Sequence, residues 1–359
     1  MTEAQIIETL LDFIAADTTD DDDFNNLAMQ IFEYQFENNT PYQRFCRQRE
    51  KTPRTVRTWK KIPAVPINGY KDLILSCCDP ESAERTFMTS GTTKGGVRGK
   101  CHHPTLSVYN ASMIAAFRQR FMQGDDRLRM GILFPTPETM PNSSLAHYLW
   151  LALNEFGAEG SRYLFTDDGV DLAQLIDELE RSQKTGEPYA LLGASFSYVH
   201  VLDELDKLGI SFHLPEGSRI LDTGGFKGQS RELELNDFYE MLSNRFGVPR
   251  SKCINMYGMT ELSTQFYDWG NGECPSVKSG PRWIRSQVVN PLTGEELPTG
   301  EKGVLIHCDL AHFNCVSSIL TEDAGVEVEN GFSLLGRAEG AEAKGCSMAV
   351  DEFLRAAQG

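Results

Sequence analysis

Apolar side chains recur at helical spacing in two stretches near the start of the chain. Residues 2–15 carry them three and four positions apart, and residues 24–36 repeat the pattern, so each stretch predicts an amphipathic helix. Thr2 and Gln5 have the spacing of a capping box at the first of these helices. Residues 20–23 form an acidic run between the two helices, which we interpret as a solvated loop.

After residue 90 the pattern changes to short apolar runs that alternate with helical stretches. A helix is predicted over residues 231–246, between two of these runs. From residue 303 onward the pattern is that of strands and turns, with Asn330-Gly331 in a hairpin turn. The alternation of strand and helix predicts an α/β layer fold. The apolar runs lie at residues 130–134, 189–196, 218–225 and 253–258.

The composition is typical of a folded chain and excludes some classes of binding partner. Of the 359 residues 40% are hydrophobic, which is typical of a globular rather than a disordered protein. Because 51 acidic residues outnumber 34 basic ones, the net charge is −17, and broad electrostatic binding to nucleic acid or anionic membranes is not expected. The chain has no run of 18 apolar residues and no cationic targeting region at its start. We therefore expect a cytoplasmic protein without an integral membrane segment.

Cysteine and histidine residues give little indication of a metal site. The nine cysteines are odd in number and form no CxxC pair, which argues against a disulfide framework or a zinc ribbon. Residues 101–103 read Cys-His-His, and four further residues cluster in a second stretch. Neither group has the usual ligand spacing of zinc, so no metal is expected at either. The second group consists of His307, Cys308, His312 and Cys315.

Residues 89–99 read TSGTTKGGVRG and contain four glycines. Glycine lets the backbone approach a phosphate closely, and hydroxyl groups together with Lys94 or Arg98 can bind its oxygens. The segment is not a Walker A loop, because Lys100 is followed by Cys101 rather than by serine or threonine. On composition alone it is either a phosphate loop or a flexible turn.

Three further segments carry residues that suit a nucleotide. In NMYGMTE, directly after a predicted strand, Tyr257 can stack on a base, Thr260 can bind a phosphate and Glu261 can hold a hard divalent cation. In LTEDAG, Asp323 can accept hydrogen bonds from two sugar hydroxyls. Residues 222–225 end another strand, where open α/β sheets place their ligands.

Taken in order, these segments resemble the adenylate-forming (ANL) superfamily. TSGTT is similar to its phosphate loop, NMYGMTE to its YGxTE motif, Asp323 to its ribose-binding aspartate and Gly336-Arg337 to its GR motif. More narrowly, the chain resembles the LuxE-type acyl-protein synthetases, the fatty-acid-activating component of bacterial luminescence reductase complexes. The added matches, between residues 60 and 347, are IPAVPINGYK, PNSSLAHYL, LLGASFSYVHVLDEL, TGGFKG, YGMTELSTQFYD and GRAEGAEAKGCS.

This resemblance implies a fold and an activity. The implied fold is α/β: a large N-terminal ANL adenylation domain with mixed and parallel sheets flanked by helices and a β-rich C-terminal part, without the small C-terminal ANL domain. The implied domains are a helical segment 1–58, an adenylation core 59–335 and a short tail 336–359. The implied reaction uses ATP and Mg²⁺ to convert a fatty acid or related carboxylic acid to acyl-AMP. The acyl group then passes to a protein cysteine, with an acyl reductase or another acyl-acceptor protein as partner.

The resemblance also implies roles for single residues. Cys346 would accept the acyl group, and its place near Lys344 in a polar tail predicts an accessible thiol with a favoured thiolate. Lys227 would supply the cation of the absent small domain, with Lys94 and Arg98 behind it. The implied catalytic residues are Cys346, Lys227, Thr260 and Glu261, the last as Mg²⁺ ligand, and the implied nucleotide-binding residues are Thr89, Ser90, Gly91, Thr92, Thr93, Gly224, Gly225, Tyr257, Gly258, Asp323 and Arg337.

Two alternatives remain open. A CoA ligase of the phenylacetate type would use the same nucleotide motifs with a soluble thiol as acceptor, and a covalent acyl adduct formed without CoA would exclude it. A non-catalytic subunit that binds acyl or adenylate ligands within a reductase complex would have no need of the full motif set, and release of pyrophosphate would exclude it.

Overall fold

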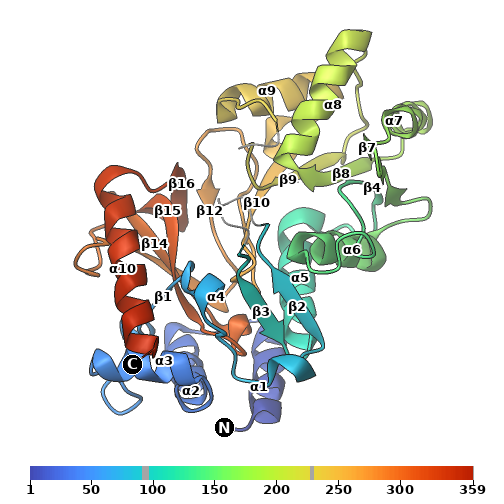
Figure 1. Ribbon diagram of the computed structural model, residues 1–359. Helices are drawn as coiled ribbons and strands as arrows, with labels where there is room; N and C mark the ends of the chain where they lie inside the picture. Colours follow the sequence, from blue (N-terminus) through green and yellow to red (C-terminus); the bar gives the residue numbers. More distant parts are fainter. Residues whose placement is uncertain (91–96, 227–229, 359) are drawn as a thin grey trace. The chain divides into compact units, whose positions relative to one another are not determined.

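The computed structural model describes residues 1–90, 97–226 and 230–358, which Figure 1 colours from the N-terminus to the C-terminus. Contacts divide the chain into two compact units. The first unit is built from three separate stretches of chain, and the predicted domain boundaries after residues 58 and 335 stay a prediction. The first unit consists of Met1–Ala115, Met259–Thr264 and Ser279–Gly359, and the second of Ala116–Gly258 and Gln265–Lys278.

The chain begins with three helices, two of which start with capping boxes. The box predicted at Thr2 and Gln5 is confirmed, since each backbone N–H donates to the other side chain. The prediction of a solvated acidic loop at residues 20–23 is wrong, because Asp20 caps the second helix and Asp23 completes its capping box. Carboxylates suit this place because they accept hydrogen bonds from unpaired N–H groups at the positive end of the helix dipole. The helices are α1 (Glu3–Ala15), α2 (Asp21–Asn38) and α3 (Thr40–Gln48).

The sheet of the first unit is an antiparallel meander in the order β16-β15-β14-β13. The turn between β15 and β16 is confirmed, with Asn330 at a φ of 65°, which asparagine tolerates better than most residues. Beside this sheet, β1 runs parallel to β15, while β2 and β3 form a separate hairpin. The strands are β1 (Val65–Pro66), β2 (Arg85–Met88), β3 (Lys100–His103), β13 (Ile284–Val289), β14 (Lys302–Asp309), β15 (Ser318–Val328) and β16 (Gly331–Arg337).

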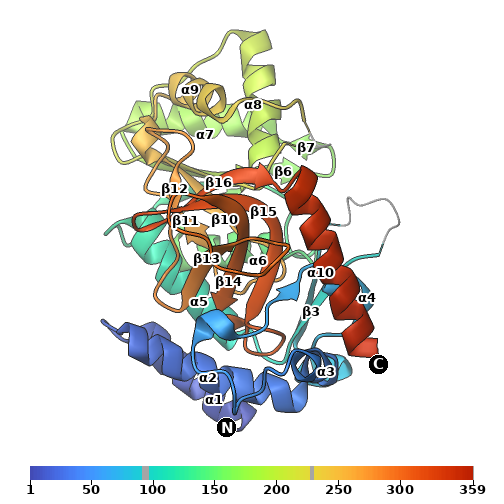
Figure 2. The same cartoon turned by 90° about the vertical axis from the view of Figure 1, so that its left-hand side faces the viewer.

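The C-terminal residues form a packed helix, which corrects the expectation of a polar tail. This helix, α10 (Gly340–Gln358), contacts α3, β1, β15 and the short helix α4 (Gly69–Asp72), and Figure 2 shows it beside α4. Phe353 of α10 is fully buried and meets Phe45 edge to face, with ring centroids 4.9 Å apart. The sequence suggests a tail because its apolar positions are sparse, but those few are covered by the rest of the first unit.

The second unit is an α/β sheet in the order β11-β10-β9-β8-β4-β5, parallel throughout except at β11. Apolar side chains of α7, α8 and α9 share one core with the strands. Figure 1 shows α8 and α9 on one side of this sheet and α6 on the other. The prediction of an α/β fold is confirmed. The elements are β4 (Arg129–Leu133), α6 (Ser144–Phe156), β5 (Arg162–Tyr163), α7 (Leu172–Thr185), β8 (Tyr189–Ala194), α8 (Ser195–Leu208), β9 (Arg219–Thr223), α9 (Leu235–Phe246), β10 (Cys253–Tyr257) and β11 (Phe266–Tyr267).

The described residues also form the helix α5 (Ser107–Phe117), the short strands β6 (Phe165–Thr166), β7 (Gly169–Val170) and β12 (Val277–Lys278), and several short 3-10 or π segments. Over residues 1–90, 97–226 and 230–358, no helix combines the length and the apolar character needed to cross a membrane.

Candidate functional site

The β2–β3 hairpin closes the base of the predicted phosphate loop. The N–H of Thr89 donates to the carbonyl oxygen of Gly99, and the N–H of Gly99 donates to Thr89 Oγ1, both at 3.0 Å. A Cβ atom at Gly99 would lie 3.2 Å from Thr89 Cγ2 and 3.3 Å from Tyr70 Cβ, so glycine fits this closure best. Ser90 is exposed. The other predicted loop residues, Gly91, Thr92, Thr93 and Lys94, lie outside the described residues.

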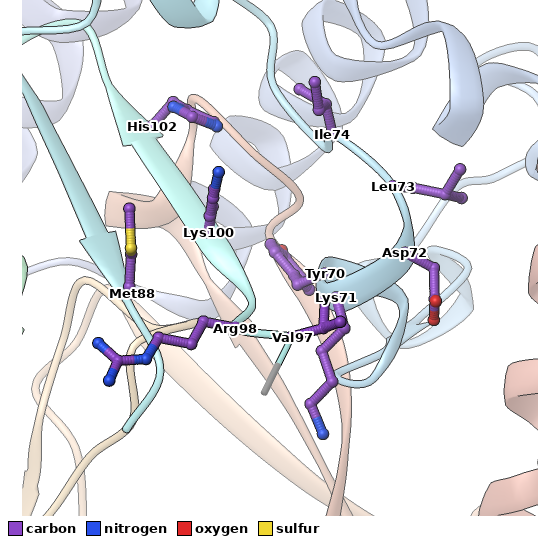
Figure 3. A pocket seen from close by; sticks show the side chains of 10 residues that line it. All are labelled: Tyr70, Lys71, Asp72, Leu73, Ile74, Met88, Val97, Arg98, Lys100 and His102. Carbon is purple, nitrogen blue, oxygen red and sulfur yellow. The ribbon is translucent and has the colours of Figure 1, made fainter. Parts of the chain in front are cut away.

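A pocket of about 480 Å³ lies between this hairpin and α4 (Figure 3). Lys71, Arg98 and Lys100 contribute three cationic side chains to its lining. Such a group of cations attracts phosphate or carboxylate groups. Arg98 is predicted here from the sequence, whereas Lys71 and Lys100 are not. The one sequence signal for Lys71 is its place at the end of the IPAVPINGYK motif.

Glu261 lies in the first unit and is buried. A Cβ atom at Gly99 would lie 3.6 Å from Glu261 Oε1, so the carboxylate faces the base of the phosphate loop. Burial raises the pKa of Glu261 to about 7, against the opposing charges of His312, Arg337 and Lys71. Its oxygens are ligands of the kind that Mg²⁺ prefers, and a divalent cation would compensate the buried negative charge.

The predicted ribose-binding residues lie opposite each other on two paired strands. Asp323 of β15 is the register partner of Arg337 of β16, and Arg337 Nη1 lies 3.4 Å from Asp323 Oδ1. The same guanidinium nitrogen lies 3.7 Å from Glu322 Oε2. Asp323 is buried and Arg337 is half exposed, so the carboxylate is covered while the guanidinium reaches the surface. Neighbouring strands thus bring together two residues that are fourteen positions apart in the sequence.

Cys346 differs most from its predicted setting. It lies in α10 with only 3% of its surface exposed, and its Sγ donates to the carbonyl oxygen of Thr321 at 3.8 Å. Burial raises the pKa of the Cys346 thiol to about 11, and the negative charges of Glu322 and Glu342 add to the effect. The predicted accessible thiolate beside Lys344 is therefore wrong for this conformation, because acidic groups and apolar packing surround the sulfur instead.

In the second unit, the predicted adenine-binding glycines lie at the carboxyl end of β9. Gly224 and Gly225 are exposed, and Gly224 has a φ of 80°, which favours glycine. Just before them, buried Asp222 accepts hydrogen bonds from Ser195 Oγ at 2.7 Å and from the Tyr239 hydroxyl at 3.0 Å. Burial raises the pKa of Asp222 to about 6. The sequence places Asp222 in a segment that suits a ligand, and in the structure its hydrogen bonds hold this strand end in place.

The YGMTE motif begins in the second unit and ends in the first. Tyr257 ends β10, is 9% exposed and has its ring centroid 5.9 Å from that of Phe266. Gly258 is exposed and Thr260 is half-buried. Lys227 lies outside the described residues.

Three residues that the sequence does not favour as ligands come together in the first unit. Cys101, His312 and Cys315 place a sulfur, a ring nitrogen and a second sulfur within 4.8 Å of one another. Burial opposes ionisation of both Cys315 and His312. The interactions of Cys315 with Cys101 and His312 nevertheless lower the pKa of its thiol, and the attraction of Cys315 raises the pKa of the His312 imidazole. His307 lies apart from them, with its Nδ1 2.8 Å from Ser286 Oγ.

Comparison with solved structures identifies the fold. The 2-hydroxyisobutyryl-CoA ligase in complex with 2-HIB-AMP matches with a TM-score of 0.61 and 14% identity, over 88% of this chain and 67% of that chain. ATP-bound MatB from Rhodopseudomonas palustris matches with a TM-score of 0.53 and 16% identity, over 72% of this chain and 49% of that chain. The alignment thus spans about half the length of MatB. The fold is that of the ANL adenylate-forming enzymes, as predicted.

Comparison with sequences identifies the family. The chain is 22% identical over 342 residues to the long-chain-fatty-acid–luciferin-component ligase of Vibrio harveyi, covering 92% of this chain and 88% of the relative. A family model described as "Acyl-protein synthetase, LuxE" matches residues 12–355. Because this match extends over nearly the whole chain and includes the predicted nucleotide-binding segments, the chain belongs to the LuxE acyl-protein synthetase family.

Proposed function

We propose that this protein activates a fatty acid with ATP, forming acyl-AMP and pyrophosphate, and then transfers the acyl group to Cys346. The observation that carries the proposal is the setting of strand β15. Its residue Asp323 pairs with Arg337, and the sulfur of Cys346 contacts the carbonyl oxygen of Thr321, two residues away on the same strand. A ribose-binding pair and a thiol acceptor that both contact strand β15 suit an enzyme that first makes and then consumes an acyl-adenylate.

ATP and Mg²⁺ are the cofactors in this proposal. Thr89 and the loop that follows it would bind the triphosphate, Asp323 and Arg337 the ribose, and Glu261 the Mg²⁺, whose charge neutralises phosphate oxygens when it is bound. Support comes from the residues themselves, because a buried carboxylate faces the base of the loop and a cation-lined pocket adjoins it. The adenylate in the 2-hydroxyisobutyryl-CoA ligase structure, which shares the fold, agrees with this assignment.

A cation must also stabilise the reacting α-phosphate, and Lys227 remains our first candidate. Lys227→Ala should lower the rate of adenylation strongly and change the KM for ATP little, because the charge matters most in the transition state. Pyrophosphate release measures this. If the variant keeps the full rate, the role passes to Lys94 or Arg98, which are tested next. The other pocket cations, Lys71 and Lys100, follow, and each lysine or arginine can be replaced by methionine in turn.

Acyl transfer to Cys346 requires a nucleophilic attack by its thiolate and a movement of α10. The thiolate attacks the carbonyl carbon of acyl-AMP, a C–S bond forms, the C–O bond to the phosphate breaks and AMP leaves. Since Cys346 is 3% exposed and its sulfur contacts β15, α10 must move away from the strand before the sulfur can reach an acyl-adenylate. The thioester would then pass its acyl group to an acyl reductase or another acceptor protein.

Intact-mass spectrometry tests the proposal. The full chain is incubated with ATP, Mg²⁺ and a panel of fatty acids without CoA, and wild type should gain one acyl group that hydroxylamine removes. Cys346→Ser should still release pyrophosphate but carry no adduct, whereas Cys274→Ser, which changes a half-buried cysteine of the second unit, should behave as wild type. An adduct that persists in Cys346→Ser contradicts the proposal.

One observation favours a second candidate function, an acyl-CoA ligase. The burial and raised pKa of Cys346 disfavour reaction at this thiol in the present conformation. A soluble thiol such as that of CoA could accept the acyl group without exposure of Cys346. Adding CoA to the same assay separates the two functions. A ligase would form acyl-CoA at equal rates in wild type and Cys346→Ser, with no acyl-protein in either.

A further inference from the structure

Cys101, His312 and Cys315 form a fully buried cluster in the first unit. Their ligand atoms all lie within 4.8 Å of one another, and none of the three residues has any exposed surface. Cys101 lies on β3, His312 ends the short 3-10 helix Leu310–His312 that follows β14, and Cys315 comes three residues later. Two sulfurs and one imidazole nitrogen are the soft donor set that Zn²⁺ prefers in proteins.

One nitrogen of His312 is positioned and the other lacks a hydrogen bond. Nδ1 lies 3.0 Å from Ser263 Oγ, and the N–H of Ser263 donates to Asp309 Oδ2 at 2.8 Å, which holds the serine in place. Nε2 is buried and, among the residues that the structure describes, has no hydrogen-bond partner. A metal-binding histidine typically has this arrangement, with one nitrogen fixed by a neighbour and the other coordinating.

Neighbouring groups complete the surroundings of a metal. Asn314 Nδ2 donates to Cys315 Sγ at 3.4 Å, a hydrogen bond that suits a thiolate ligand. The Tyr70 ring lies 6.3 Å from the His312 ring between centroids, and its buried hydroxyl likewise has no hydrogen-bond partner within the described ranges. Tyr70 also lines the cation-rich pocket. A structural zinc ion takes four ligands, so the hydroxyl of Tyr70 or a water molecule from this pocket would occupy the fourth position.

The sum of the ligand charges favours a bound metal ion in this fully buried cluster. Two thiolates and one neutral imidazole around Zn²⁺ sum to zero, which a fully buried site tolerates, whereas an uncompensated thiolate there would be costly. We propose that Cys101, His312 and Cys315 bind a zinc ion, which ties β3 at the base of the phosphate loop to the segment after β14. This proposal goes beyond acyl transfer and does not depend on it.

Metal analysis of the full chain, purified in buffers without added metal, tests the proposal. Elemental mass spectrometry should find one zinc ion per chain. Cys101→Ser and Cys315→Ser should each lower the zinc affinity at least about tenfold, because each removes a ligand. Cys308→Ser is the matched control, since Cys308 is equally buried but lies on β14 outside the cluster, and it should retain the zinc.

Wild type alone provides a second test that does not depend on folding of the variants. After zinc is removed, Co²⁺ should bind with the strong visible absorption of a tetrahedral site and the near-ultraviolet charge-transfer band of thiolate ligands. Bound zinc should also protect Cys101 and Cys315 from alkylation, as mapped by peptide mass spectrometry. The proposal is overturned if folded wild type binds neither ion, if Cys308→Ser loses zinc as readily as Cys315→Ser, or if the two cysteines are found as a disulfide.

Discussion

At the scale of single residues, Glu261 is a buried carboxylate facing the loop that we expect to bind phosphate. We predict that Glu261→Gln lowers pyrophosphate release by about 100-fold or more, because a neutral amide is a poor Mg²⁺ ligand and leaves phosphate charge uncompensated. The fold should survive, since the two side chains have nearly the same shape. Glu296→Gln, which changes a partly exposed carboxylate paired with Lys60, is the control. Wild-type turnover in Glu261→Gln would remove Glu261 from the metal site.

His307 makes stability depend on pH. Burial lowers the pKa of His307 to about 3, whereas an unfolded chain protonates its histidines near pH 6.5. Between these values the unfolded state binds one more proton than the folded state, so the free energy of unfolding falls as the pH falls, by up to about 1.4 kcal/mol per pH unit. Between pH 7 and pH 5 this single group should lower the free energy of unfolding by about 2 kcal/mol.

The test replaces His307 and measures urea unfolding at pH 7 and at pH 5. His307→Asn should lose about 2 kcal/mol less than wild type over this interval, because asparagine does not titrate. His213→Asn, at an exposed histidine, should keep most of the wild-type pH dependence. An equal loss in wild type and His307→Asn would show that His307 does not contribute.

At the scale of elements, the packing of α10 controls access to Cys346. Phe353 is fully buried against Phe45, and a Cβ atom at Gly69 would lie only 2.5 Å from Phe353 Cε1, so the helix and α4 are in close contact. We predict that Phe353→Ala costs about 3–5 kcal/mol of stability and loosens α10. Alkylation of Cys346 by iodoacetamide, followed by mass spectrometry, should then become at least tenfold faster.

A substitution on the exposed side of the same helix provides the control. Met348 is 55% exposed, so Met348→Ala should change neither stability nor the alkylation rate appreciably. Equal alkylation rates in wild type and Phe353→Ala would show that the sulfur becomes accessible without movement of α10.

At the scale of the whole molecule, the second unit is nearly continuous in sequence. All six strands of its sheet and its shared core lie within residues 116–278, and the buried ion pair between Arg129 and Glu178, at 2.8 Å, lies there too. We predict that a fragment of residues 116–278 folds alone, with cooperative urea unfolding and an α/β circular dichroism spectrum. A fragment of residues 59–335 should be less stable than the full chain, because it lacks the helices that cover the first unit. A disordered fragment 116–278 would contradict the division into these units.

Some features of the candidate site can be predicted from sequence motifs and others cannot. Their order in the sequence is enough to predict an adenylate-forming fold and a shared ribose-binding role for Asp323 and Arg337. The structure adds that these two residues face each other on paired strands. The setting of Cys346 could not be predicted in this way, since it depends on residues of β15 about 25 positions earlier. Lys71 acts electrostatically on Glu261, although it precedes Glu261 by more than 180 positions in the sequence. No local sequence pattern predicts that two such distant residues lie near each other.

By itself, the sequence determined the features that arise within a few residues or along one regular pattern. The capping box at Thr2, the turn at Asn330 and the alternation of strands and helices in the second unit are of this kind, because helical and strand periodicity act over short distances. Tertiary structure alone decided that α10 is a packed helix, that Cys346 is buried, and that Cys101 meets His312 and Cys315. These features depend on contacts between distant parts of the chain, where burial sets the free energy of a side chain and its ability to ionise.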